Sequence, residues 1–147
     1  MKILNEAQLT FLSKSTNESY ARVAVASFFT QLDPTVDEIT DIKTAVSEAV
    51  TNSIVHGYRN TMGKVFITAR ILENGTAYIK IRDKGCGIPD VKQAMEPMFT
   101  TAREEERAGL GFAVMQTFMD KVKVTSKVGS GTTVVMVKKL KSRSANG

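Results

Sequence analysis

Three polar side chains recur at every fourth position along one stretch of the sequence: Glu48, Asn52 and His56. At about 100° per residue in an α-helix, such positions fall on one narrow stripe. A carboxylate such as Glu48 can accept a proton, and a carboxamide oxygen such as that of Asn52 suits a hard cation. The same spacing also describes the solvated face of an ordinary helix. The stripe therefore indicates a site only if other segments supply the remaining parts.

The segment 83–89, Asp-Lys-Gly-Cys-Gly-Ile-Pro, directly follows a strand-like run. Gly85 and Gly87 let the backbone approach a flat ligand closely. The carboxylate of Asp83 can accept hydrogen bonds from an exocyclic amine, as on adenine. A plain turn at the end of a strand is the alternative. Cys86 is interpreted as a small filler between the glycines rather than as a nucleophile.

A Gly-x-Gly pair, Gly109 and Gly111, stands where a loop enters a helix. Backbone N–H groups at such a point can cradle phosphate, although the pair lacks the Gly-Lys-Ser/Thr of a Walker A loop. The preceding segment 99–108 is too long and polar for packed core, so it is either a functional lid or a solvated charge run. In a lid, Arg103 and Arg107 could reach phosphates.

Length and composition predict one domain over residues 1–147, with 140–147 as a frayed tail. The chain has 42% hydrophobic and 24% charged residues, which is typical of a globular protein. No apolar run approaches the roughly 20 residues of a membrane span, and the N-terminus becomes polar too early for a signal peptide. With Cys86 as the one cysteine there is no internal disulfide, which favours a reducing cytoplasm.

The net charge of +5 is concentrated near the C-terminus. Residues 121–147 contain seven of the 20 Lys and Arg residues and none of the 15 acidic ones. These cations alternate with Val and Thr, and no aromatic residue among them could stack on a base. We interpret them as the outward face of two strands, and expect no direct nucleic-acid partner.

Two Ser/Thr-x-x-Glu spacings, at 15–18 and 35–38, predict capping boxes that open two helices. The first helix should run to about Leu32 and the second to Gly57. The apolar side expected for the first helix consists of Tyr20, Val23, Ala24, Phe28 and Leu32. The apolar arc expected for the second consists of Ile39, Ile42, Val46, Ala49, Val50 and Ser53.

Period-two alternation predicts strands over 64–72 and 76–82, and Asn74-Gly75 between them predicts a hairpin. The other expected elements are a strand at 2–12, a helix at 109–120, and strands at 122–128 and 132–140. This order predicts an α+β, two-layer sandwich: one mixed β-sheet with helices on one face.

The order of these motifs is more specific than any one of them. Glu-x-x-x-Asn, Asp-x-Gly-x-Gly, a lid, Gly-x-Gly and Gly-Thr-Thr follow one another. This order resembles the Bergerat-type ATP-binding fold shared by gyrase, the Hsp90 chaperone, histidine kinases and the mismatch-repair protein MutL. The sequences of segments 47–58, 82–90 and 97–101 are similar to those of the anti-sigma serine kinases of sporulating bacteria. The motif also resembles the related anti-sigma B kinases of the stress response.

The resemblance implies ATP or ADP and Mg²⁺ as cofactors, with a role for each motif. Glu48 would be the general base, and Asn52 would hold Mg²⁺ together with the phosphates. Asp83 would bind the adenine amino group, helped by Thr132 through water, in a pocket shaped by Gly85 and Gly87. The residues implied at the phosphates are Thr101, Arg107, Gly109 and Gly111.

The resemblance also implies partners: a homodimer, a sigma factor of the sigma F type, and an anti-anti-sigma protein whose serine is phosphorylated. Glu18, Arg22 and Glu106 are the residues expected to contact a partner. The lid sequence is more acidic than expected, which leaves the role of Arg103 open. Alternatives are a module that sequesters a sigma factor without phosphoryl transfer, and a histidine-kinase fragment. Glu48 argues against the first, because sequestration needs no base; the absence of a preceding phospho-acceptor hairpin argues against the second.

Overall fold

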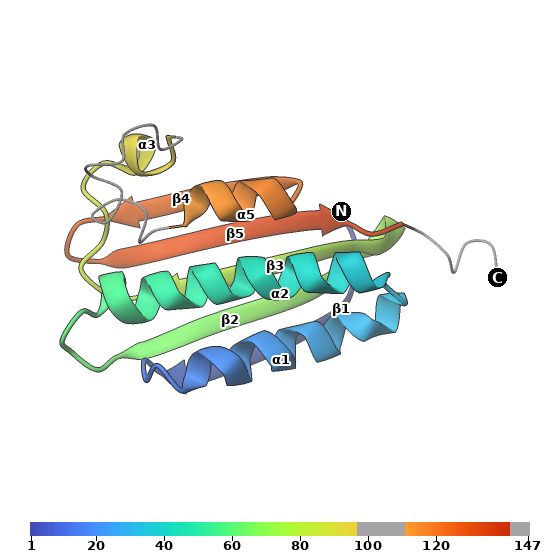
Figure 1. Cartoon of the computed structure of the whole chain (residues 1–147), viewed down its shortest axis with the longest axis horizontal. Coiled ribbons are helices and arrows are strands. Elements are labelled where there is room, and N and C mark those ends of the chain that lie inside the picture. Colours follow the sequence, from blue (N-terminus) through green and yellow to red (C-terminus); the bar gives the residue numbers. More distant parts are fainter. Residues whose placement is uncertain (97–110, 142–147) are drawn as a thin grey trace.

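The protein is a two-layer α+β sandwich, in which helices cover one face of a five-stranded sheet (Figure 1). The computed structural model describes residues 1–96 and 111–141. The strands are β1 Ile3–Leu12, β2 Lys64–Leu72, β3 Thr76–Asp83, β4 Lys121–Lys127 and β5 Gly131–Lys139. The helices are α1 Asn17–Phe29, α2 Val36–Thr51, α3 Val91–Ala94 and α5 Phe112–Phe118, with a 3₁₀ turn Thr30–Leu32 after α1 and a π-helical turn Asn52–Gly57 after α2.

The sheet has the order β1-β2-β3-β5-β4, and each neighbouring pair of strands is antiparallel. The α+β sandwich with helices on one face is confirmed, but the sheet is not mixed. Helices α1 and α2 lie between β1 and β2 in the sequence. Each helix runs along the sheet once, so β2 is antiparallel to β1. The connection from β3 to β4 includes α3 and α5, and β4 runs parallel to β3, but β5 lies between them and the two strands do not pair.

Helix α2 begins with the expected capping box. The hydroxyl of Thr35 accepts from the backbone N–H of Glu38, and the Glu38 carboxylate accepts from the Thr35 N–H, at 3.0 and 2.9 Å. The same carboxylate accepts from the N–H of Lys141 at 2.8 Å, which ties the end of β5 to the start of α2. Burial opposes ionisation of Glu38, but these hydrogen bonds outweigh it and lower its pKa.

The capping box predicted for α1 is absent. The helix starts after Thr16, whose side chain makes no capping hydrogen bond. The Glu18 carboxylate accepts instead from the hydroxyl of Ser47 on α2. The hydrogen bond from Ser47 therefore replaces the capping contact expected for Glu18, and it links α1 to α2.

The buried side of α1 also differs from the prediction. Ala21, Val25 and Phe29 lie in the core, at i, i+4 and i+8, whereas Tyr20 and Val23 are 53% and 55% exposed. Two adjacent stripes of this helix are apolar, and the stripe with a small alanine packs against α2 and the sheet. Of the predicted side, Tyr20 and Val23 remain on the surface, whereas Phe28 and Leu32 are partly buried and pack against the core.

The core lies between α2 and the sheet, and it fixes the orientation of the helix that carries the Glu48 stripe. The predicted arc of α2 is confirmed, since Ile42, Val46 and Val50 are fully buried. Opposite them lie Ile79 and Met136 of the sheet. Leu140, at the end of β5, is buried as well. No described helix is long and apolar enough to cross a bilayer.

Candidate functional site

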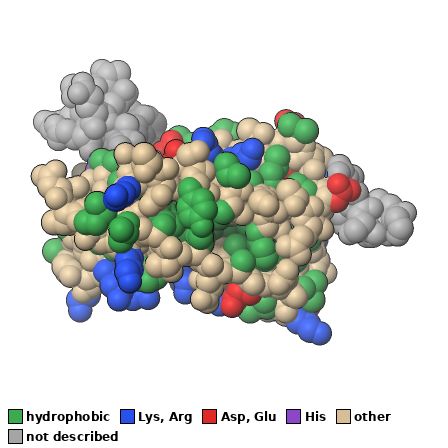
Figure 2. All heavy atoms as spheres, turned by 90° about the horizontal axis from the view of Figure 1, so that it is seen from below, with side chains coloured by type: hydrophobic (Ala, Val, Ile, Leu, Met, Phe, Trp, Pro, Cys, Tyr) green, Lys and Arg blue, Asp and Glu red, His purple; other side chains and the backbone are tan. Residues whose placement is uncertain are grey.

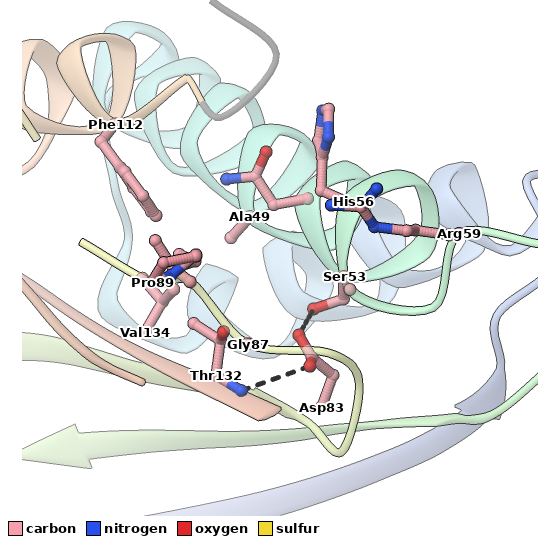
Figure 3. A pocket seen from close by; sticks show the side chains of 13 residues that line it. Ala49, Ser53, His56, Arg59, Asp83, Gly87, Pro89, Phe112, Thr132 and Val134 are labelled. Atoms are coloured by element: carbon pink, nitrogen blue, oxygen red, sulfur yellow. Dashed lines mark hydrogen bonds between the residues drawn. The ribbon is translucent and has the colours of Figure 1, made fainter. Parts of the chain in front are cut away.

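A pocket opens where the end of α2 and its π-helical turn meet the loop after β3 (Figure 3). Asn52, Ser53 and His56 form the helical wall, and Arg59 lies in the turn that follows. The facing walls are formed by Asp83, Gly87, Ile88, Pro89, Phe112, Thr132 and Val134. The pocket thus collects residues from four separate segments of the chain, including most of those singled out in the sequence.

The Asp83 carboxylate forms the closed end of the pocket and is only 4% exposed. The hydroxyl of Ser53 donates to its Oδ2 at 2.8 Å, and the backbone N–H of Gly85 donates to its Oδ1 at 2.9 Å. The backbone N–H of Thr132 donates to Oδ1 at 3.3 Å (Figure 3). A carboxylate has about four acceptor positions, so these donors leave capacity for one more, such as an exocyclic amine.

A second set of hydrogen bonds holds the loop after β3 against the β4–β5 hairpin. The hydroxyl of Ser126 accepts from the N–H of Ile88 at 2.7 Å and lies 2.8 Å from the Thr132 hydroxyl. Ser126 also donates to the carbonyl of Gly131 at 3.0 Å. Through Thr132 this chain of contacts reaches Asp83, so the wall and the closed end of the pocket are positioned together.

The two glycines of the Asp83 loop have different positions. Gly87 lines the pocket with φ of 80°, and a Cβ there would overlap the carbonyl of Lys127. Gly85 does not line this pocket; it packs against Gly57 and orients Asp83 through its N–H. Cys86 donates its N–H to the Gly57 carbonyl at 2.8 Å, which agrees with its interpretation as a small filler.

The opposite end of the helical stripe brings Glu48 close to the start of α5. Gly111 precedes α5 in the left-handed region, at φ of 59°, and a Cβ there would overlap Oε2 of Glu48. Burial raises the pKa of the Glu48 carboxyl. A carboxylate whose pKa is raised toward neutrality is better matched to proton abstraction. Glu48 and Gly111, two predicted site residues, are thus adjacent in space.

The π-helical turn supplies three of the residues that line the pocket. Its extra residue per turn is seen in the hydrogen bond from the Tyr58 N–H to the Ser53 carbonyl, at 2.9 Å. Asn52, Ser53 and His56 of this turn all line the pocket. Tyr58 then fixes the end of the turn, since its hydroxyl donates to the Lys64 carbonyl and accepts from the Lys84 N–H at 2.8 Å.

The sequence interpretation gave no site role to Ser53 and Ser126; it placed His56 on the stripe of Glu48 and Asn52 but assigned it no role either. The α-helical period places Ser53 on the apolar arc that faces the sheet, and there its hydroxyl meets Asp83 at the end of β3. No sequence pattern marked Ser126 as a site residue, because its hydrogen-bond partners depend on the pairing of β4 with β5. Thr101, Arg103, Glu106, Arg107 and Gly109 lie outside the described residues.

The donor set fits a magnesium ion that is held mainly by other ligands. Asn52 is 8% exposed and lines the pocket one helical turn after Glu48. Within residues 1–96 and 111–141, no group of three His, Cys, Asp or Glu side chains could hold a metal ion. Mg²⁺ commonly uses one or two protein oxygens together with phosphates and waters, so a single carboxamide is sufficient.

Comparisons with known proteins agree with this geometry. Residues 11–138 match the family described as the histidine kinase-like ATPase domain, a class of nucleotide-binding domains. The RsbU and RsbW domains of a Mycobacterium tuberculosis protein share the fold, with a TM-score of 0.68 at 19% identity over 95% of this chain and 34% of that chain. The fold and the pocket therefore define a nucleotide-binding domain of the histidine kinase-like ATPase class.

Proteins similar in sequence identify a family within this class. The chain is 59% identical to the anti-sigma F factor of Caldanaerobacter subterraneus subsp. tengcongensis, over 94% of this chain and 96% of that protein. It is 53% identical to the anti-sigma F factor of Geobacillus kaustophilus, over 91% and 92%. The chain belongs to the anti-sigma F factor family of histidine kinase-like ATPase domains.

Replacing Ser53 by Ala should weaken nucleotide binding, because the buried Asp83 carboxylate loses one of its donors. A hydrogen bond to a charged group contributes about 1.5–3 kcal/mol, so we expect the Kd for ADP to rise about tenfold or more. Isothermal titration calorimetry measures this. Ser13→Ala is the control, since it removes a hydrogen bond from the Gly63 N–H, at 3.0 Å, outside the pocket. An unchanged Kd in Ser53→Ala would show that Asp83 does not contact the nucleotide.

Proposed function

We propose that this protein is an anti-sigma factor and a Mg-ATP-dependent protein serine kinase. It would bind and inhibit a sigma factor of the sigma F type and phosphorylate a serine of an anti-anti-sigma protein. One observation carries the kinase proposal: Glu48, with its raised pKa, lies against Gly111 at the start of α5. The names of the relatives support the anti-sigma proposal. A cytoplasmic location fits both.

Each described residue has a role in this proposal. Asp83, oriented by Ser53 and Thr132, accepts a hydrogen bond from the adenine amino group. Asn52 and Gly111 would hold the phosphates of ATP, whose γ-phosphoryl group would pass to the serine oxygen with release of ADP. Glu48 takes the proton from the attacking serine hydroxyl, and Asn52 holds Mg²⁺ through its carboxamide oxygen. Bound Mg²⁺ neutralises phosphate charge. Phosphoryl transfer depends mainly on positioning and charge neutralisation, which this arrangement supplies.

The lid completes the proposal from outside the described residues. Arg107 would stabilise charge on the transferred phosphoryl group, and Thr101 and Gly109 would contact the phosphates. These roles come from the resemblance of the motifs, and they extend the phosphate end of the site beyond Gly111.

Replacing Glu48 by Gln should abolish phosphoryl transfer but preserve nucleotide binding. Gln keeps the size of the side chain and cannot accept the serine proton, so we expect kcat to fall by about 10²–10⁴-fold. In the unchanged protein, transfer should rise with pH through the raised pKa of Glu48, because the base must be ionised. The measurement uses γ-labelled ATP, Mg²⁺ and the anti-anti-sigma partner across a pH series, with ADP affinity measured in parallel.

Two outcomes would contradict the kinase proposal. Label on a histidine of this chain would indicate a histidine kinase. The second outcome is that the unchanged protein binds ADP tightly and captures the sigma factor but labels no serine. That result would indicate a module that sequesters the sigma factor without phosphoryl transfer. Which sigma factor co-purifies distinguishes the sigma F type from the stress-response sigma B type.

Helix α1 is the proposed contact with protein partners. Arg22 lies 3.7 Å from the Glu18 carboxylate, and its side chain is 38% exposed. Glu18 is more strongly committed within the fold, since it also accepts from Ser47. Arg22 is therefore the more available of the two for a carboxylate on a partner, and Glu106 of the lid is the third proposed contact.

Replacing Arg22 by Ala should weaken the sigma-factor complex about tenfold or more, as expected for an interface arginine. ADP affinity should not change, because Arg22 does not line the pocket. Surface plasmon resonance with the purified sigma factor measures the first, and calorimetry the second. Arg70→Ala is the matched control, since Arg70 pairs with Glu6 at 2.6 Å on the sheet. Equal affinity of Arg22→Ala and the unchanged protein would exclude this contact.

The edge strand β1 is the proposed homodimer surface. It pairs with β2 on one side, and its other edge presents backbone donors and acceptors that favour strand pairing. Ile3 and Leu4 on β1 are 44% and 60% exposed, and Tyr20 and Val23 on α1 are exposed as well. Figure 2 looks onto this side and shows hydrophobic side chains gathered near its middle.

Replacing both Ile3 and Leu4 by Lys should convert the dimer to a monomer, because two charges would be buried in the interface. Sedimentation velocity at micromolar concentration measures the mass. Val128→Lys is the control: Val128 is 63% exposed in the turn between β4 and β5, at the opposite edge of the sheet from β1, and its change should leave the dimer intact. A dimer that survives the double change would place the interface elsewhere.

A further inference from the structure

The sheet face that the helices leave uncovered is strongly basic. Side chains alternate along each strand, so those opposite to the buried Ile67, Ile79 and Val134 project from this face. Its cations from β3 and β4 are Lys80, Arg82, Lys121, Lys123 and Lys127; β2 adds Lys64 and Arg70. Among the strand residues on this face the one acid is Glu6, which pairs with Arg70. Figure 2 shows Lys and Arg along its lower rim, the side away from the helices.

Aromatic rings lie among these cations. The guanidinium of Arg70 stands 5.0 Å from the Tyr78 ring centre. Arg82 and Lys84 stand 5.6 and 5.4 Å from the ring centre of Phe66. Phe66 and Tyr78 are half-buried, so part of each ring remains accessible. The face therefore combines positive charge with planar groups.

Strand pairing creates this combination. The lysines near residues 121–127 have no aromatic neighbour in the sequence, and the expectation of no nucleic-acid partner depended on that. In the sheet, Tyr78 pairs with Val137, and Val137 pairs with Lys121. Lys80 and Lys123 share a row across Val135, about 10 Å apart at the usual strand spacing. Val137 of β5 therefore lies between the Tyr78 ring and Lys121, which stand about 10 Å apart on the same face, while Lys80 and Arg82 belong to the same strand as Tyr78.

We propose that this open sheet face binds single-stranded nucleic acid without strong sequence preference. Phosphates would contact the lysines, and bases would stack on the rings and guanidinium planes of the central strands. An acidic polypeptide would use the charge but not the planar groups, and a flat sheet does not enter a duplex groove. The surface lies across the sheet from the nucleotide pocket, so it is independent of the proposed kinase activity.

The test measures binding of a fluorescein-labelled 20-nucleotide mixed-sequence single strand, as DNA and as RNA, by anisotropy with the full-length protein. Affinity should fall linearly with the logarithm of salt concentration, by about 0.7 in slope for each phosphate contacted. Lys80→Glu with Lys123→Glu should reduce affinity about tenfold or more at low salt. Lys14→Glu with Lys92→Glu is the control of equal charge change off this face, and should reduce it much less. Both pairs should keep the ADP affinity of the unchanged protein.

A second comparison isolates stacking. Tyr78→Leu keeps the charge of the face, so it should weaken binding of the single strand but not of a poly-glutamate peptide. Several results would overturn the proposal: no binding at 50 mM salt, equal loss in the face and control pairs, or equal affinity for the duplex of the same sequence. Tight binding of poly-glutamate without binding of the single strand would assign the face to an acidic polypeptide instead.

Discussion

The buried carboxylate of Asp83 is the constraint on which the site depends. A carboxylate removed from water costs several kcal/mol unless donors replace its hydration. Here the donors come from the π-helical turn, from the loop after β3 and from the start of β5. Burial of Asp83 is favourable only when these segments meet. The geometry that stabilises this corner of the fold is therefore the same geometry that forms the closed end of the pocket.

The helical wall serves both ends of the site. Glu48 must lie beside Gly111 at one end, and Ser53 must reach Asp83 at the other. Five positions correspond to about 140° around an α-helix, so Glu48 points toward the start of α5 while Ser53 points toward the sheet. The π-helical turn changes the phase after Thr51, within a single continuous helix. Such turns commonly occur at functional sites. This one lies between Glu48 and the loop after Asp83, the residue proposed to bind adenine.

Local signals explain what the sequence could predict. The capping box at Thr35, the hairpin at Asn74 and the period-two strands depend on near neighbours, and each is present. Asp83, Asn52 and Thr132 were identified by motif order, and they do line one pocket. The errors occurred where two local solutions were equally good. Helix α1 has two adjacent apolar stripes, and only the shape of α2 and the sheet selects Ala21 and its stripe.

The remaining omissions concern residues whose role depends on pairing between distant strands. Ser126 reaches Ile88 and Thr132 because β4 pairs with β5. The same pairing places the β4 lysines on the same face as Tyr78, with β5 between them. A sheet covered on one face does not require charge on the other, because Thr or Ser would fill those positions equally well. A concentration of lysine and arginine there, with one paired acid, therefore has no explanation in the stability of the fold. Like charges brought together on a sheet repel one another, so this face carries an energetic cost that a polyanionic ligand would relieve.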